Sequence, residues 1–372
     1  MSFATDVFAD NQKLPQARSS PGTVRQPILA PRFDAETVTN NLRGRIIAQG
    51  GAIDAVDRVL RTVQMGLQDP ERPLASFLLV GPTGVGKTEL VRRLAAEIRG
   101  GADDFCRVDM GSLAQEHYAA SFAGAPPGYA GSKEGFSVFE RDLVEGDAYR
   151  PGIVLFDEVE KASPVVLRAL LQVLDRGILR LSNGQQTISF RNSLIFMTSN
   201  LGTRELADGQ HRRSRRQTGL SRRSRAGTSG SRAATSTLGD DEAIVSAAVE
   251  KFFDPEFLNR IDETVFFREI SAQSAVDIAG LELRLLQQRL QAELVSLHVA
   301  DNVARHVCEL GYDPAYGARS LRRIIQRHVL PEVADALRHS RGEARRPITI
   351  RLAVQGQAFI AVAEPDEATA TA

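Results

Sequence analysis

The stretch Phe77-Leu-Leu-Val80, followed directly by Gly81-Pro-Thr-Gly-Val-Gly-Lys87-Thr88, decides the fold of this 372-residue chain. Four apolar residues lead into a glycine-rich loop that fits the Walker A pattern G-x-x-x-x-G-K-[ST], and Glu89 to Ile98 then continue with helical periodicity. A strand, a loop and a helix in this order begin a parallel sheet of the α/β class. We therefore expect a phosphate-binding loop at the carboxyl end of the first strand.

The residues of this loop predict a nucleotide site with a magnesium ion. Backbone N–H groups close around the phosphates, and the N-terminus of the following helix favours their negative charge. Lys87 is expected to reach the β- and γ-phosphates, and the Thr88 hydroxyl is expected to ligate Mg²⁺. The predicted phosphate-binding residues are Gly81, Pro82, Thr83, Gly84, Val85, Gly86, Lys87 and Thr88.

A second apolar strand, Ile153 to Phe156, ends in the carboxylates of Asp157 and Glu158, which fits a Walker B motif. Such a strand places its acids at the carboxyl edge of the sheet, beside the phosphate loop. Asp157 is expected to hold Mg²⁺, and Glu158 is expected to polarise the attacking water as general base. Charges often follow strands for structural reasons alone, but the complete phosphate loop upstream favours the catalytic interpretation.

Other segments extend this α/β pattern. An amphipathic helix is predicted before the core, two more strands and a helix within it, a hairpin that turns at Asn183-Gly184, and a further helix after it. The first helix spans Ala35–Leu67, the two strands span Phe105–Val108 and Leu194–Thr198, and the helix between these strands spans Pro164–Leu174. The hairpin spans Leu179–Phe190, and the last helix spans Glu242–Phe253.

The pattern changes near Ile270, where long helices and two alternating runs replace the α/β order. The predicted helices are Ala275–Leu297, Val303–Leu310 and Ser320–Leu337, and the predicted strands are Ile348–Leu352 and Ala358–Val362. We therefore expect a large domain over residues 34–269 and a smaller C-terminal α+β domain over 270–363. Residues 1–33 are expected to form a flexible lead, and 364–372 a flexible tail.

Charge is balanced overall, with 46 basic and 46 acidic residues, but it is unevenly distributed. Residues 211–232 contain eight arginines and no acid, among many Ser, Gly and Thr, which predicts a disordered basic insert over 208–241. Such a tract could attract nucleic acid or an acidic partner. No aromatic residues lie between the arginines, so stacking on bases is unsupported and a nucleic-acid partner is not favoured.

Three further observations concern the compartment. No apolar run approaches the roughly 20 residues of a membrane helix, and the first ten residues lack a basic, apolar leader. The two cysteines, Cys106 and Cys308, have no metal-ligand spacing, which is typical of free thiols in a reducing compartment. We therefore expect a cytoplasmic protein without a membrane anchor.

Several signatures in sequence order resemble the second ATPase module of the Clp family (ClpA, ClpB and ClpC type). They cover roughly Leu42 to Leu337, interrupted by the basic tract, and comprise Asp157–Ala162, Leu170–Asp175, Phe190–Asn192, Met197–Gly202, Phe252–Asp262 and Gly311–Leu321. The resemblance implies an AAA+ P-loop fold, a parallel sheet flanked by helices with a small C-terminal lid domain. It also implies that the chain hydrolyses ATP.

The resemblance assigns roles to residues outside the two Walker motifs. Asn200 matches the sensor that orients the attacking water, Arg260 the arginine finger that reaches the γ-phosphate of a neighbouring subunit, and Arg319 the second sensor in the lid. Ile46 and Ile47, within Arg45–Gln49, match the residues that flank the adenine. The family usually has glycine where Ala48 stands.

One further segment indicates what the ATPase acts on. Gly124–Ser132 resembles the pore loop of the family, in which Gly128, Tyr129, Ala130 and Gly131 form the tip that grips a translocating polypeptide. The aromatic ring offers a broad amphipathic contact, and the glycines let the loop move. The family commonly has an aliphatic residue where Ala130 stands.

The function expected from these features is that of an ATP-dependent protein unfoldase or remodelling chaperone, which assembles as a homo-oligomeric ring, a hexamer by the resemblance. Its substrate would be an unfolded or tagged protein, selected by the lead, the insert or an adaptor, since the family's substrate-binding N-terminal domain, first ATPase module and coiled-coil arm are not expected here. Thr218-Gly219-Leu220 is either a degenerate docking loop for a ClpP-type peptidase or, the favoured interpretation, a chance match. Two alternatives stay open, a regulatory assembly factor and a nucleic-acid motor that uses the basic insert.

Overall fold

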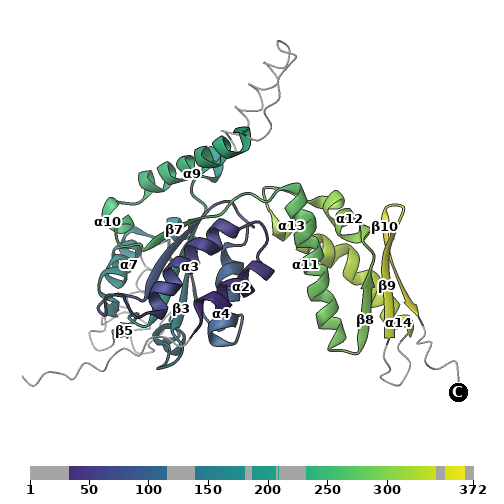
Figure 1. The fold of residues 1–372 in the computed structure, drawn as a ribbon, viewed down its shortest axis with the longest axis horizontal. Coiled ribbons are helices and arrows are strands. Elements are labelled where there is room, and N and C mark those ends of the chain that lie inside the picture. The colour runs from purple at the N-terminus through teal and green to yellow at the C-terminus, as the bar shows by residue number, and fades with distance from the viewer. Residues whose placement is uncertain are drawn as a thin grey trace, which may run out of the picture.

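The computed structural model describes residues 33–114, 139–180, 187–206, 208, 232–340 and 348–364. Its centre is a five-stranded sheet in the order β2-β3-β6-β1-β7, in which all neighbouring strands run parallel (Figure 1). The strands are β1 (Ala75–Val80), β2 (Cys106–Asp109), β3 (Gly152–Asp157), β6 (Ser193–Ser199) and β7 (Glu263–Phe266). The expected parallel sheet is therefore confirmed, and β7 is a strand that the sequence analysis missed.

The inner strands are apolar throughout because both faces of the sheet are covered. Phe77 and Leu79 of β1 belong to one buried cluster, whereas Leu78 and Val80 belong to the cluster on the opposite face. Phe77 is paired in register with Phe196 of β6, and their rings stack with centroids 4.8 Å apart. This two-sided burial holds the carboxyl ends of the strands in fixed positions.

Helices from different parts of the chain cover the two faces. The face that carries Phe77 packs against α2 (Ala35–Arg45), α3 (Gly50–Gln64) and α4 (Lys87–Arg99), and the other face packs against α7 (Pro164–Arg176), α9 (Arg232–Phe252) and α10 (Pro255–Leu258). Shorter elements complete this half, namely η1 (Met110–Leu113), α6 (Arg141–Glu145), η2 (Val159–Lys161) and the antiparallel hairpin β4 (Ile178–Arg180) and β5 (Thr187–Ser189). The predicted turn of this hairpin lies outside the described residues.

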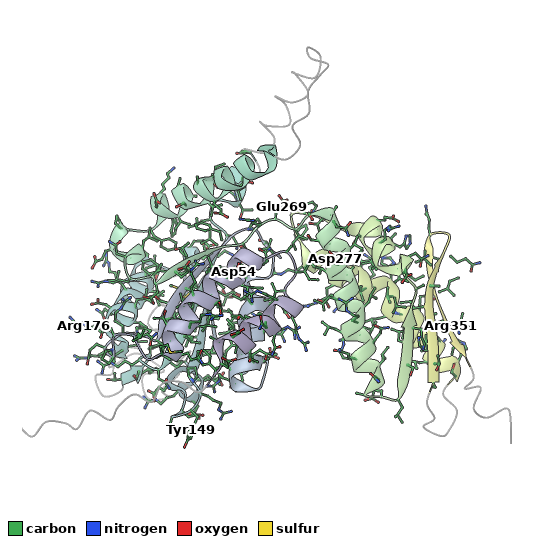
Figure 2. All side chains as sticks on the ribbon, viewed as in Figure 1. Asp54, Tyr149, Arg176, Glu269, Asp277 and Arg351 are labelled. Atoms are coloured by element: carbon green, nitrogen blue, oxygen red, sulfur yellow. The ribbon has the colours of Figure 1, made fainter. Side chains whose placement is uncertain are left out.

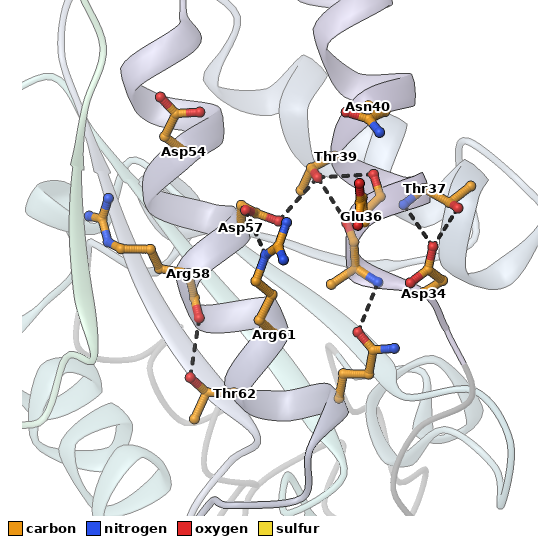
Figure 3. Close-up of polar contacts among 12 residues, drawn as sticks. Asp34, Glu36, Thr37, Thr39, Asn40, Asp54, Asp57, Arg58, Arg61 and Thr62 are labelled. Atoms are coloured by element: carbon orange, nitrogen blue, oxygen red, sulfur yellow. Dashed lines mark hydrogen bonds and ion pairs between the residues drawn. The ribbon is translucent and has the colours of Figure 1, made fainter.

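The single helix predicted over Ala35–Leu67 is wrong, because the chain forms two helices with a break between Arg45 and Gly50. Apolar spacing continues across the break, which is why periodicity does not reveal it. Polar side chains join the two helices side by side (Figure 3). Thr39 donates its hydroxyl to Asp57 at 3.1 Å, and Gln64 accepts the N–H of Ala35 at 3.2 Å.

The C-terminal half has its own three-stranded sheet, in the order β10-β9-β8, and lies to the right in Figure 1. Its elements are α11 (Ala272–Gln291), β8 (Val295–Val299), α12 (Asn302–Gly311), α13 (Ala318–Ile324), a π-helical turn over Ile325–Val329, α14 (Leu330–Ser340), β9 (Ile348–Gln355) and β10 (Ala358–Glu364). The structure is thus a parallel α/β domain followed by a smaller α+β domain, as the sequence predicted. In Figure 2, Glu269 marks the link between the two halves and Asp277 marks α11.

Two further predictions need correction. The helix expected over Ala275–Leu297 ends at Gln291, because Leu294 adopts a left-handed backbone (φ 62°) and Val295–Val299 then pair with β9 as a strand. Part of the insert expected to be disordered, 208–241, is helical, since α9 begins at Arg232. Burial of Val245 and Val249 holds the C-terminal part of this helix against the sheet, and the N-terminal part continues away from the sheet.

Among the described residues, no helix is both long and apolar enough to span a bilayer.

Candidate active site

A cavity of about 740 Å³ lies where the strands of the large sheet end. Its walls come from the loop after β1, the ends of β3 and β6, and the helices α11 and α13 of the lid domain. The predicted site residues that line it are Ile46, Ile47, Thr83, Gly84, Val85, Gly86, Lys87, Thr88, Asp157, Glu158, Asn200 and Arg319. Residues that lie as much as 273 positions apart in the sequence therefore meet at one place.

The Lys87 ammonium is buried at the base of the phosphate loop, with 7% of the residue exposed. Its Nζ donates to the carbonyls of Gly81 (2.5 Å) and Pro82 (2.9 Å) and to Oδ1 of Asn200 (2.8 Å). Burial, partly offset by the carboxylates of Glu160 and Asp157, lowers the pKa of Lys87 from 10.5 to about 8. Gly81 and Pro82 do not line the cavity but hold this lysine.

Two glycines of the loop permit close approach by other backbone segments. Gly81 has φ 148°, and a Cβ there would lie 2.4 Å from the carbonyl oxygen of Phe267. Gly84 has φ 77°, and a Cβ there would lie 2.0 Å from the carbonyl oxygen of Tyr316 in the lid domain. The N–H of Ala318 also donates to the carbonyl of Gly84 at 3.0 Å. The phosphate loop is therefore in direct main-chain contact with the lid.

The two acids of the Walker B strand are organised by Thr198, which the sequence analysis counted only as a strand residue. The Thr198 hydroxyl donates to Oδ1 of Asp157 at 2.5 Å and accepts the N–H of Glu158 at 3.0 Å. Glu158 itself has a left-handed backbone with φ 60°, an unusual conformation for a residue with a side chain. Its carboxylate forms an ion pair with Lys161, and Arg107 pairs with Oδ2 of Asp157 at 2.5 Å.

Asn200 lies just beyond β6, where two contacts fix it. Its side-chain oxygen accepts from Lys87, and its N–H donates to Oε1 of Glu160 at 3.1 Å. Glu160 therefore holds the backbone of the predicted sensor, a role that its place between Glu158 and Lys161 in the Walker B signature could have suggested.

The predicted adenine segment is the break between α2 and α3. Ile46 and Ile47 line the cavity, and apolar side chains of the lid (Ile270, Ile278, Leu281 and Leu285) complete an apolar end that suits a flat aromatic base. Ala48 has φ 63°, which explains why glycine is usual there in the family.

Gln49, which the sequence analysis did not single out, fastens this segment. It is 2% exposed, donates to the carbonyl of Arg268 at 2.9 Å and accepts the N–H of Arg268 at 3.0 Å. A buried amide that satisfies both backbone groups of one distant residue fixes the path of the chain beside the phosphate loop.

The two predicted arginines lie in different places. Arg319, in the first turn of α13, lines the cavity. Arg260 does not line it and instead pairs with Asp175 of α7, with Nη1 2.8 Å from Oδ1. The pore-loop residues Gly128, Tyr129, Ala130 and Gly131, and the tripeptide Thr218-Gly219-Leu220, lie outside the described residues.

A five-stranded parallel sheet with a phosphate loop is the architecture expected of an AAA+ ATPase, and comparison with known proteins agrees with this class. The family described as AAA domain (Cdc48 subfamily) matches residues 72–264, and the C-terminal, D2-small domain of ClpB protein matches residues 270–351. The chain belongs to the AAA+ ATPases, which bind nucleotide and hydrolyse ATP, as the sequence predicted.

Within that class the chain belongs to the Clp/ClpB type. It is 48% identical over 357 residues to an ATP-dependent protease ATP-binding subunit-like protein of Rhodococcus erythropolis, covering 96% of this chain and 97% of the relative. It is 44% identical over 311 residues to the ATP-dependent protease ATP-binding subunit-like protein AmiB of Pseudomonas aeruginosa, covering 82% and 80%. Chaperone protein ClpD, chloroplastic, of Arabidopsis thaliana is 39% identical over 323 residues, which cover 84% of this chain but 31% of ClpD.

Proposed function

We propose that this ATPase forms a ring in which hydrolysis between subunits drives the unfolding or remodelling of other proteins. The observation that carries the proposal is the location of the predicted catalytic groups. Glu158, Asn200 and Arg319 line one cavity together with Lys87, whereas Arg260 lies outside it. A guanidinium on another surface can act on a γ-phosphate when a second copy of the chain presents it, and such a group can increase the rate by about 10³–10⁵.

Within one subunit, each group would have a distinct task. Lys87 would hold the β- and γ-phosphates by charge, with Arg319 closing the cavity from the lid. Glu158 would accept a proton from the water as its oxygen attacks the γ-phosphorus, and ADP would leave as the bond to the bridging oxygen breaks. Asn200, held by Lys87 and by Glu160, would orient that water.

A magnesium ion fits the donor set of this cavity. Thr88 supplies a hydroxyl and Asp157 a carboxylate, both hard oxygen ligands, and both line the same cavity. The ion would neutralise negative charge on the phosphates. Thr198 and Arg107 each contact one oxygen of the Asp157 carboxylate, and these contacts fix its orientation.

We further propose that residues 34–269 and 270–363 move as two bodies when nucleotide changes. The main-chain contact between Gly84 and Ala318 supports this, because a change at the phosphate loop reaches the lid without an intervening side chain. In a ring, which the family resemblance implies is a hexamer, that movement would carry the Tyr129 segment along the pore.

A polypeptide substrate, and a ClpP-type peptidase or an adaptor as partner, are the partners this proposal implies. The names of the Rhodococcus and Pseudomonas relatives, ATP-dependent protease ATP-binding subunit-like protein, support a link to proteolysis, and the ClpD and ClpB relatives are named chaperones. We also propose that the protein acts in the cytoplasm.

The test uses the full chain, ATP and a fluorescent protein with an unstructured tag, with and without a ClpP-type peptidase. Loss of fluorescence that depends on ATP is expected, and Tyr129→Ala should abolish it while ATP turnover continues. Tyr149→Ala, which removes an exposed ring near β3 (57% exposed; Figure 2), is the matched control and should leave unfolding unchanged. Unfolding that survives Tyr129→Ala would contradict threading.

The same assay separates the alternatives. A regulatory assembly factor would assemble with ATP yet leave the fluorescent substrate folded. A nucleic-acid motor would hydrolyse ATP faster with DNA, and the stimulation would disappear when residues 211–232 are deleted.

A further inference from the structure

The guanidinium of Arg260 has a specific partner within its own subunit. Arg260 follows α10, and its Nη1 lies 2.8 Å from Oδ1 of Asp175, the penultimate residue of α7. The side chains of both residues are partly exposed, at 39% and 34%. The pair therefore sits on the surface of the subunit, where a second copy can reach it.

The backbone of Arg260 is tied to the same end of α7. Arg72, in the segment before β1, donates from Nη2 to the carbonyl of Arg260 at 2.7 Å and from Nε to the carbonyl of Leu174 at 3.2 Å. Ser76 of β1 donates its hydroxyl to the carbonyl of Arg260 at 3.1 Å. Arg72 therefore links the main chain of Arg260 to the last turn of α7, and Asp175 links the side chain of Arg260 to the same turn.

A single carboxylate contact can orient an arginine side chain and still leave N–H donors for another partner. The guanidinium has five N–H donors in a rigid plane, and Asp175 engages Nη1, which leaves donors on the opposite side for a phosphate. A free arginine side chain has many rotamers, and holding it before the partner arrives lowers the entropy lost in the transition state.

We propose that Asp175 is a positioning residue, which aims Arg260 at the nucleotide of the neighbouring subunit. The proposal rests on the proposed action of Arg260 between subunits. Asp175 touches neither the nucleotide nor the reacting atoms, and it acts only through Arg260. Because α7 follows the Walker B strand through η2, the finger of each subunit is also attached to the part of the chain that carries its own Asp157 and Glu158.

The experiment mixes two inactive chains. Lys87→Ala, the donor, cannot hold nucleotide but keeps Arg260, and Arg260→Ala, the acceptor, holds nucleotide but offers no finger. Mixed rings should recover ATP hydrolysis at acceptor sites that adjoin a donor. Asp175→Asn added to the donor should lower the recovered kcat by about threefold to tenfold, since one long side chain is no longer ordered.

Four controls make the result specific. Asp175→Asn added to the acceptor should not change the recovered rate, because that chain has no Arg260 to orient. The KM for ATP should stay constant in all mixtures, and Asp175→Glu in the donor should restore part of the loss. Glu263→Gln in the donor, which removes another surface partner of an arginine (Arg58, 2.8 Å), should have no effect.

Each other outcome overturns the proposal in an identifiable way. If the two parent chains recover no hydrolysis when mixed, action between subunits is wrong and the role of Asp175 fails with it. If hydrolysis recovers but Asp175→Asn in the donor changes nothing, only the role of Asp175 is wrong. An equal loss with Asp175→Asn in the acceptor would assign Asp175 to the fold of α7.

Discussion

At the scale of single residues, Lys87 combines a charge with near-complete burial. Its pKa of about 8 follows first from desolvation, which Glu160 and Asp157 only partly offset. A nucleotide would reverse the balance, because negative phosphates favour the protonated ammonium. Proton uptake by Lys87 and nucleotide binding are therefore linked.

The sign of this linkage gives a prediction for pH. Below pH 8, Lys87 is already charged in the free protein and affinity for nucleotide should change little. Above pH 8, the free protein loses the proton that the complex needs, so affinity should fall, with a limit of about tenfold per pH unit. Titration with a fluorescent ATP analogue at pH 7, 8 and 9 measures it.

A matched variant shows whether Lys87 is the group that titrates. Lys87→Arg should bind more weakly overall, but its affinity should lose the fall above pH 8 because the guanidinium stays charged. Wild-type affinity that stays constant to pH 9 would mean that Lys87 keeps its proton in the free protein.

Ala48 stores strain beside the cavity. Its left-handed backbone (φ 63°) is unfavourable for any residue with a Cβ. Ala48→Gly should raise the free energy of unfolding by about 0.5–1 kcal/mol, the relief of strain less the entropy lost by glycine. Urea unfolding measures it, and Ala55→Gly inside α3 is the opposite control, with an expected loss of about 1 kcal/mol. Destabilisation by Ala48→Gly would show that the conformation carries no strain.

At the scale of elements, the ends of β3 and β6 act as one unit through Thr198. Thr198→Val keeps the shape but removes the hydroxyl that binds Asp157 and receives the N–H of Glu158. A loss of about 1.4 kcal/mol of transition-state stabilisation corresponds to a kcat roughly tenfold lower. ATP turnover measures this, and Thr198→Ser, which keeps the hydroxyl, should stay close to wild type. Equal losses in both variants would point to packing of the methyl group.

The elements also show what sequence can predict and why. Strands buried on both faces, such as Ile153–Phe156, were predictable because every position is apolar. The two helix breaks were not, since left-handed residues with side chains, Ala48 and Leu294, carry no glycine signal. β7 was missed because Glu263 and Thr264 interrupt its apolar character, and its pairing with β1 supplies what its composition lacks.

The same distinction holds for the site. Residues in contiguous motifs, such as Lys87 and Asp157, were found from their own spacing, and the family resemblance supplied Asn200 and Arg319. Thr198 and Gln49 act through contacts between distant segments. Those contacts exist only once the sheet has formed, so local patterns do not contain them.

At the scale of the whole molecule, assembly should depend on whether nucleotide is retained. Glu158→Gln removes the proposed base while Lys87 and Thr88 still hold the phosphates, so it should trap ATP-bound rings. Mass photometry with ATP should show a larger fraction of rings than for wild type, with turnover reduced at least about a hundredfold. Glu250→Gln on α9, outside the cavity, should assemble and turn over as wild type does. Normal turnover by Glu158→Gln would mean that another residue is the base.

The hydrogen bond and the close approach between Gly84 and residues 316–318 are made by peptide groups, and this has an evolutionary consequence. A joint that uses only atoms shared by all amino acids tolerates drift in the side chains around it, since no particular chemistry at positions 316 or 318 has to be preserved. Selection on this joint acts on the freedom of the backbone at Gly84 and Gly317. Side chains on the lid around this contact could therefore change over evolution while the main-chain contact itself is kept.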